Sequence, residues 1–312
     1  MSRTRVTISP IYSEPGTKSA FLIGVLLSVD DTRLLLDCGW SEAFASDAIL
    51  APLRRIAPTL DAVLISFGDI SHAGGLPILY RGLEDGGAGC LAPVYMTPPA
   101  NQFASLTLSD AHRARSLEEP EWELGAFRLA DVDAAFAFRS EGGPVAQVRF
   151  LEECTVRGGV LVTAYAAGFS LGGAMWRIVR GVESVVFAPK LHHRSEGHLP
   201  KALVASLLHS PSALIVDGGF AGRPFLDGTQ ENAERTLPPA SAPPGAPPRV
   251  REAWEAALVE SAVRVLQRGG SVLLPTDTAG RSLEILFRLD AEYGTRYPWP
   301  IYFVSHKAFE VR

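Results

Sequence analysis

Two acidic residues and one histidine stand where the chain could hold a metal ion. Asp37 follows the apolar run at 34–36, and Asp69 and His72 follow a second apolar run at 61–66. Carboxylates and imidazoles that meet at strand ends are typical ligands of zinc-dependent hydrolases, and each ion of a two-metal centre needs about three or four protein ligands. By this count the sequence predicts an empty site, with no catalytic residue, no cofactor and no resident metal.

One loop resembles the metal-binding loop of a hydrolase: Ser66-Phe67-Gly68-Asp69-Ile70-Ser71-His72, followed by Gly74-Gly75-Leu76-Pro77. In the familiar arrangement, Ser-His-x-His-x-Asp-His is followed by Gly-x-Leu-Pro. The frame is kept here, but the ligands inside it are not. Phe67 stands at the first histidine position, Asp69 at the second and Ser71 at the aspartate position.

Two later segments carry the same kind of loss. Residues 167–176 resemble an Ala-Gly-His-x-x-Gly segment in which Phe169 replaces the histidine, and 187–190 resemble a strand end in which Lys190 replaces a bridging aspartate. Phenylalanine cannot coordinate a metal ion, and an ammonium group repels one. The order and spacing are those of metallo-β-lactamase-fold nucleases. The vestigial ligand positions are Asp37, Phe67, Asp69, Ser71, His72, Phe169 and Lys190.

Within that fold the chain resembles one family, the non-catalytic subunit 2 of the cleavage and polyadenylation specificity factor. That family keeps aspartate at the second histidine position of the loop, as Asp69 does here, whereas the active endonuclease subunit has histidine there. Phe169 and Lys190 depart further, because the family often retains ligands after the loop. The matching segments are Leu34–Trp40, Ser66 with Asp69 and His72, Ala130–Phe136, His198-Leu199 and Asp277–Arg281.

The resemblance implies a structural pseudo-nuclease subunit of pre-mRNA 3′-end processing, located in the nucleus. Its implied partners are the active nuclease subunit and a symplekin-like scaffold, with contact to pre-mRNA left open. One alternative is the pseudo-nuclease subunit of the Integrator complex. Another is an active metal-dependent RNA hydrolase with a shifted ligand set, namely Asp69, His72, His192 and His193.

Lys190 suggests how a site without metal is stabilised. If the fold is kept, its ammonium lies near Asp37 and Asp69, where it partly replaces the missing cation, since buried carboxylates need a charge or hydrogen-bond partner. The alternative is a solvent-facing lysine without a partner. An amine more than about 6 Å from both carboxylates excludes the first interpretation, because attraction is weak at that range.

The composition is that of a folded protein without a dominant charge. The 312 residues are 47% hydrophobic and 20% charged, with a net charge of −5, which argues against a mainly electrostatic mode of nucleic-acid binding. Three cysteines without CxxC spacing indicate a reducing compartment. A membrane span is not expected, because no run of about eighteen uncharged apolar residues occurs. Four basic residues could form a modest strip for RNA phosphates, although scattered charge is favoured: Arg177, Arg180, Lys190 and Arg194.

Apolar periodicity predicts the elements that position these residues. A hairpin is expected over 21–39 and a strand buried on both faces at 61–66. Residues 110–124 are expected to hold a helix and an exposed loop. An amphipathic helix is expected at 252–268 and a second helix at about 281–292. Further strands are predicted at 146–152, 159–166, 174–180, 184–188, 213–217, 271–276 and 301–305.

The expected fold is α/β. The resemblance implies a metallo-β-lactamase-like αββα sandwich over residues 1–210, followed by an incomplete β-CASP domain over 211–312. The proline-rich stretch 238–248 cannot form a helix or a central strand and is expected to be a surface insertion. The implied cap continues beyond this length, so the chain is expected to be a truncated or reduced form.

Overall fold

The computed structural model describes most of the chain and divides it into two compact units. The first comprises residues up to Val216, and the second the described residues from Asp217 to Phe303. Four predicted features lie outside the described residues: Arg194, His198, the stretch 238–248 and the turn 277–280. The described residues are 4–13, 21–41, 46–81, 89–118, 127–193, 195, 199–204, 210–217, 249–276, 281–293 and 299–304.

A six-stranded sheet in the order β1-β2-β3-β4-β5-β6 forms the centre of the first unit. The first three strands pair antiparallel, and β3 to β6 pair parallel. Parallel neighbours need crossover connections, which helices supply here. The strands are β1 (Val6–Tyr12), β2 (Leu22–Val29), β3 (Thr32–Leu36), β4 (Ala62–Leu64), β5 (Val94–Met96) and β6 (Val145–Gln147).

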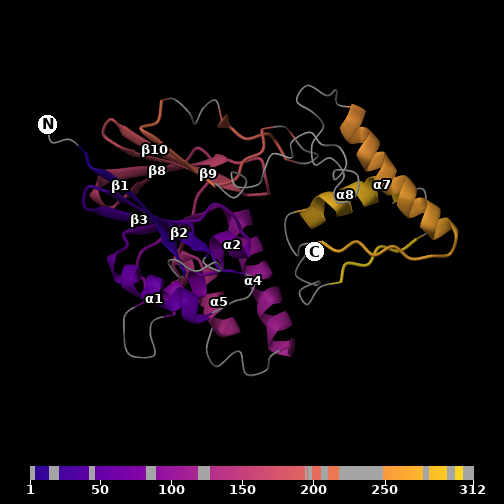
Figure 1. Cartoon of the computed structure of the whole chain (residues 1–312), viewed down its shortest axis with the longest axis horizontal. Helices are drawn as coiled ribbons and strands as arrows, with labels where there is room; N and C mark the ends of the chain where they lie inside the picture. Colours follow the sequence, from indigo (N-terminus) through magenta and orange to yellow (C-terminus); the bar gives the residue numbers. More distant parts are fainter. Residues whose placement is uncertain are drawn as a thin grey trace, which may run out of the picture. The chain divides into compact units, whose positions relative to one another are not determined.

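Helices cover one face of this sheet, and the second sheet covers the other (Figure 1). The helices are α1 (Ser46–Ile56), α2 (Ile70–Ala73), α3 (Leu76–Tyr80), α4 (Pro98–Glu118) and α5 (Leu129–Phe136), with short 3-10 helices at Ala57–Thr59, Arg139–Glu141 and Arg157–Gly159. This layering agrees with the predicted metallo-β-lactamase-like α/β sandwich.

The second sheet has five strands in the order β11-β10-β9-β8-β7. Its neighbours pair antiparallel except β10 and β11, which run parallel. Because β11 pairs with β10, the first compact unit extends past residue 210. The strands are β7 (Glu153–Val156), β8 (Val160–Ala166), β9 (Ala174–Arg180), β10 (Glu183–Ala188) and β11 (Ala213–Val216).

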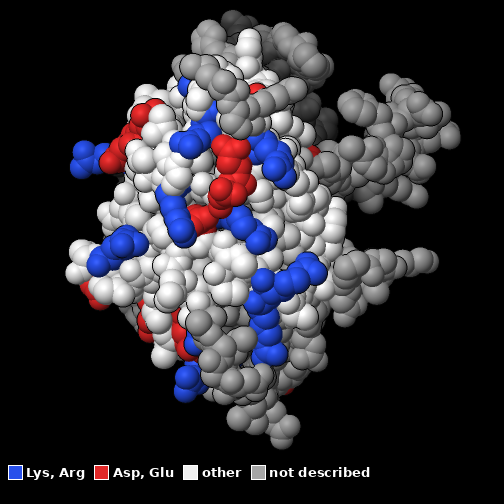
Figure 2. Space-filling view, turned by 90° about the vertical axis from the view of Figure 1, so that its left-hand side faces the viewer, with Lys and Arg blue, Asp and Glu red and all other residues white. Residues whose placement is uncertain are grey.

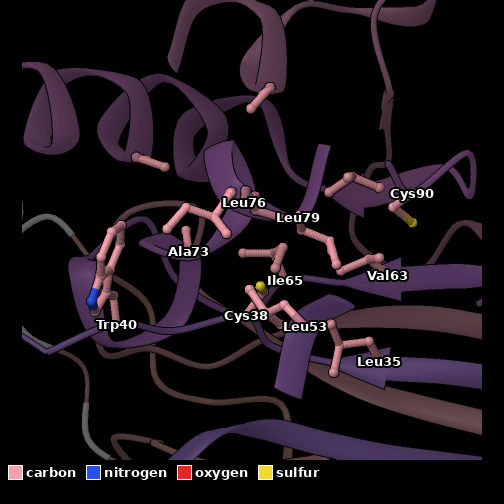
Figure 3. Close-up of a cluster of buried hydrophobic side chains, with 14 of the residues drawn as sticks. Leu35, Cys38, Trp40, Leu53, Val63, Ile65, Ala73, Leu76, Leu79 and Cys90 are labelled. Atoms are coloured by element: carbon pink, nitrogen blue, oxygen red, sulfur yellow. The ribbon is translucent and has the colours of Figure 1, made fainter. Parts of the chain in front are cut away.

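The central strands are buried on both faces, which explains their continuous apolar sequence. In β4, Leu64 points into the core between the sheets, whereas Val63 points into the core beneath the helices. Strand β3 divides its leucines in the same way. Figure 3 shows strand residues packed against helix residues in the second of these cores: Leu35, Val63 and Ile65 with Leu53, Leu76 and Leu79.

The predicted hairpin is confirmed, and one predicted strand is wrong. Strands β2 and β3 pair around a turn in which Asp30 has a positive φ of 53°. Residues 146–152 are not a single strand, because the chain leaves the first sheet after Gln147 and enters the second at Glu153. Leu151 adopts a left-handed φ of 66° within this crossover, a conformation that no regular strand allows.

The helix expected within 110–124 is the end of a longer one. Helix α4 begins at Pro98 and ends at Glu118, and residues 119–126 lie outside the described part. Two prolines stand in its first turn, where a missing N–H leaves no hydrogen bond unmade. None of the helices in the described parts of the chain is long and apolar enough to cross a membrane.

The second unit contains the two predicted helices, α7 (Arg249–Gln267) and α8 (Arg281–Tyr293). They share a small apolar core around Ala262 and Leu289. The strands predicted at 271–276 and 301–305 are wrong for their described residues, which form no regular strand. Leu273 is 87% exposed, as expected for a segment without a strand neighbour. The identity of this unit as the start of a β-CASP domain stays a prediction.

Leu64→Ala is expected to destabilise the first unit by about 2–5 kcal/mol, because it leaves a cavity between the two sheets. The matched control is Leu91→Ala, which removes the same atoms from a side chain that is 91% exposed and should change stability by less than about 0.5 kcal/mol. Urea denaturation of both variants measures the difference. Equal losses would contradict the assignment of Leu64 to the core.

Candidate functional site

The loop of residues 66–72 is fixed by the ends of two strands. Asp37 follows β3, and its backbone N–H donates to the carbonyl oxygen of Leu64 in β4 at 2.8 Å. The Asp37 carboxylate in turn accepts the backbone N–H of Ser66, with Oδ1 2.7 Å from the nitrogen. These bonds join the strand ends before the loop begins, so Asp37 and the loop keep a fixed relative position.

The short turn after β3 holds the far end of the loop. The backbone N–H of Cys38 donates to the carbonyl oxygen of His72 at 2.8 Å. Gly39 lies so close to the loop that a Cβ there would be 1.9 Å from the carbonyl oxygen of Ser71. The loop is therefore anchored at both ends by main-chain contacts that need no metal ion.

Asp37 is a buried carboxylate with a perturbed pKa. Burial raises the pKa of Asp37 from 3.8 to about 6, although the nearby His72 and the Ser66 N–H act to lower it. The residue has a positive φ of 59°, which Asp and Asn tolerate better than most non-glycine residues. No cation pairs with Asp37 among the ion pairs of the described residues.

Asp69 is held by two neighbours of its own loop. Its Oδ1 lies 2.5 Å from Nδ1 of His72 and 2.7 Å from the hydroxyl oxygen of Ser71. An ionised carboxylate only accepts hydrogen bonds, so both neighbours donate to it. Partial burial acts to raise the pKa of Asp69, but the hydrogen bond and proximity of His72, the ammonium of Lys190 and the Ser71 hydroxyl together hold it well below its usual range.

Two phenylalanines fill the space beside this carboxylate. Phe67 is 1% exposed, and its ring meets those of His72 and Phe169 edge to face, with centroids 5.0 and 5.8 Å away. Gly173 leaves room for the first ring, since a Cβ there would lie 2.5 Å from it. Phe67 and Phe169, at two of the three histidine positions of the pattern, therefore present aromatic rings that carry no ligand atom.

The segment that carries Phe169 is tied to the start of α4. The Thr97 hydroxyl donates to the carbonyl oxygen of Gly172 at 2.6 Å and accepts the backbone N–H of Ala100 at 3.3 Å. The same hydroxyl thus caps the helix and fixes the loop. This contact joins elements that are far apart in the sequence.

Lys190 follows β10 and points its amine at the loop. Its Nζ lies 3.4 Å from Oδ2 of Asp69, and 5.9 and 5.7 Å from the ring centroids of Phe67 and Phe169. The alternative of a solvent-facing lysine without a partner is therefore wrong. Its partner is Asp69, and no pair with Asp37 occurs among the described residues.

The residues present do not fit a two-metal centre. Phe67 and Phe169 offer no lone pair, and Lys190 places a positive charge against the carboxylate that would otherwise bind the ion. Among the side chains that the structure describes, no three His, Cys, Asp or Glu lie close enough together to hold a metal ion. The shifted ligand set is thus not assembled. His192 and His193 stack on each other instead, with ring centroids 5.8 Å apart.

The basic residues considered for RNA binding engage separate partners. Arg177 Nε lies 3.4 Å from the Ser184 hydroxyl, and Arg180 Nε lies 3.8 Å from Asp30, while Lys190 pairs within the site. On the face that Figure 2 shows, Lys and Arg are interspersed with Asp and Glu. These contacts favour scattered charge over a continuous basic strip.

The contacts of the two aromatic rings could not be predicted from the sequence. Their residue types show only that Phe67 and Phe169 cannot bind a metal ion. In the structure the two rings contact each other, and the Lys190 amine lies over both. Gly173 is the available signal, since the close approach of the Phe67 ring leaves no room for a Cβ there.

Asp37→Asn is expected to remove part of the pH dependence of stability. The pKa of Asp37 is about 6 in the folded chain and 3.8 as its ordinary value. Between these two values the folded chain binds more protons than the unfolded chain, so the free energy of unfolding falls as the pH rises. Asparagine does not titrate, can still accept the Ser66 N–H and tolerates the positive φ. The stability difference between variant and wild type should grow by roughly 2 kcal/mol from pH 4 to pH 7.

Urea denaturation across this pH range gives the difference directly. Asp133→Asn is the control, because Asp133 is exposed and its replacement should give a nearly flat difference. A difference for Asp37→Asn that stays constant with pH, or a loss of stability at pH 7, would contradict the assignment of Asp37 as a buried, unpaired carboxylate.

Several known proteins are similar to most of the chain. The chain is 34% identical over 307 residues to cleavage and polyadenylation specificity factor subunit 2 of Oryza sativa subsp. japonica, which covers 97% of this chain and 36% of that protein. The Arabidopsis thaliana protein of the same name is 32% identical with the same coverage. The Drosophila melanogaster protein described as a probable subunit 2 is 32% identical over 269 residues, 85% of this chain and 30% of the other.

The resemblance to cleavage and polyadenylation specificity factor subunit 2 inferred from the sequence is thereby confirmed. The chain spans about a third of the length of these relatives. The profile of the family described as "Metallo-beta-lactamase superfamily domain" matches residues 26–215, which is more than half of the chain and most of its first compact unit. The chain belongs to the metallo-β-lactamase superfamily.

Proposed function

We propose that the chain is a non-catalytic pseudo-nuclease subunit of the mRNA cleavage and polyadenylation machinery, with a structural role in pre-mRNA 3′-end processing. One observation carries the proposal: Phe67, Phe169 and Lys190 fill the place of metal ligands in an otherwise intact fold. Hydrolysis in this superfamily depends on metal ions that activate water. The similarity to subunit 2 proteins of plants and fly supports the placement in this machinery.

The retained frame supports a structural role. The main-chain bonds that join Asp37, Leu64 and Ser66 persist without ligands to position, so the fold itself is what the chain preserves. A protein with this fold and no metal centre acts through its surfaces. We infer as partners the active nuclease subunit and a symplekin-like scaffold, in the nucleus.

Contact with pre-mRNA has a secondary place in the proposed function. The net charge is −5, and the described basic residues considered for RNA binding, Arg177, Arg180 and Lys190, each have a partner inside the protein. Phosphate-driven binding needs several free cations on one face. Any RNA contact made by this part of the chain is therefore expected to be secondary to protein contacts.

The purified chain is expected to contain no stoichiometric zinc and to cleave no RNA when zinc or manganese is added. Metal analysis by mass spectrometry and a labelled-RNA cleavage assay are the measurements. Asp69→Ala should change neither result, and Asp133→Ala, an exposed aspartate, serves as the control. About two zinc ions per chain, lost together with RNA cleavage in Asp69→Ala but kept in Asp133→Ala, would overturn the proposal.

Affinity purification of the tagged chain from nuclear extract, followed by mass spectrometry, tests the choice of complex. The expected result is enrichment of the nuclease and scaffold subunits of the polyadenylation machinery, lost in the core variant Leu64→Ala and kept in Leu91→Ala. Enrichment of Integrator subunits instead would favour the alternative complex. Recovery of neither set would contradict the proposed role.

A further inference from the structure

Lys190 not only lacks the ligand atoms of an aspartate but also brings a positive charge to the end of β10. In the superfamily pattern this strand end carries a bridging aspartate, which faces the metal ions. Here it carries a cation, whose Nζ lies 3.4 Å from Oδ2 of Asp69. Lys190 thus places a positive charge at a position where the superfamily pattern has a negatively charged ligand.

The two phenylalanines complete the surroundings of this ammonium. Its Nζ lies 5.9 Å from the ring centroid of Phe67 and 5.7 Å from that of Phe169. A cation within about 6 Å of a ring centroid is attracted by the negative face of the ring. Phe67 and Phe169, at two of the histidine positions of the superfamily pattern, therefore each add a weak attraction to the ammonium.

The carboxylate that the lysine binds is the one that the loop holds most firmly. Asp69 also accepts from His72 and Ser71, so its position is set from both sides. The lysine side chain is 25% exposed, and the Asp69 side chain 43%, so water reaches the pair and moderates its strength. The aromatic contacts distinguish it from an ordinary surface ion pair.

We propose that Lys190 is an internal replacement for the metal ion: its ammonium neutralises Asp69, rests on Phe67 and Phe169, and keeps divalent cations out of the site. The inference goes beyond the proposed function, because it concerns the metal affinity and stability of the chain itself. It stands whichever complex the chain joins.

If Lys190 keeps metal ions out, substitutions at this position should change the affinity of the chain for a divalent cation. Replacement of Lys190 by a neutral side chain leaves Asp69 without its ion-pair partner, and a carboxylate at 190 adds the bridging ligand type that the superfamily uses. Removal of one positive charge at a few ångströms raises the affinity for a divalent cation markedly. An ordinary surface ion pair would show no such link to metal binding.

Zinc titration by calorimetry on the purified chain tests this link. Lys190→Asp is expected to bind Zn²⁺ at least about tenfold more tightly than the wild type, and Lys190→Arg, which keeps the charge, should bind as weakly as the wild type. Lys190→Met removes the charge and keeps the apolar stem, so it gives the same information if Lys190→Asp does not fold. Its zinc affinity should also exceed that of Lys190→Arg.

Thermal denaturation in the presence of a chelator gives the second readout. Lys190→Met is expected to lower the melting temperature by about 3–6 °C, and saturating zinc should restore part of that loss. The matched control is Arg180→Met, which breaks the exposed pair with Asp30 and should lower the melting temperature less and without any response to zinc.

Two outcomes would overturn the inference. The first is a zinc affinity that is the same in wild type, Lys190→Met and Lys190→Arg. The second is an equal, zinc-independent loss of melting temperature in Lys190→Met and Arg180→Met. Either would reduce the contact to a surface ion pair while leaving the proposed role in 3′-end processing untouched, because that role is tested by partners and RNA cleavage.

Discussion

The site depends on the join between two strand ends. Strands β3 and β4 are buried on both faces, which holds their ends in place. Asp37 connects these ends, because its backbone N–H donates to Leu64 and its carboxylate accepts from Ser66. Because these bonds are made by the main chain and by the Asp37 carboxylate, they do not depend on which residues stand at the other ligand positions. This explains how the loop could lose its ligands without loss of the fold.

Several weak interactions hold together the residues that stand at the ligand positions of the superfamily pattern. One ammonium, one carboxylate with its His72 and Ser71 donors, and two aromatic rings occupy the place of a metal centre. Each contact is modest by itself, since the pair is partly exposed. Together they balance the charge of Asp69 and occupy the space beside it, which supports the proposed non-catalytic role. The similarity to cleavage and polyadenylation specificity factor subunit 2 supports the proposed role in pre-mRNA 3′-end processing.

Much of the fold and the character of the site could be predicted from the sequence. The buried strand before Ser66 and the hairpin are strongly patterned, and the ligand losses can be counted from residue types alone. The strand at 146–152 was wrong because apolar residues that cross between sheets look like a strand. The strands at 271–276 and 301–305 lack neighbours in the described structure, and no local pattern reveals that. The Lys190–Asp69 pair was one of two alternatives, since sequence spacing cannot tell where a long side chain points.

The most direct test of a site built around a lysine is a crystal structure determined from crystals soaked in zinc, with anomalous data collected at the zinc absorption edge. The account predicts no anomalous peak between Asp37, Asp69 and His72, and a Lys190 amine that remains within hydrogen-bond or ion-pair distance of Asp69. Anomalous density bound by those three side chains, with the Lys190 amine displaced toward solvent, would contradict it.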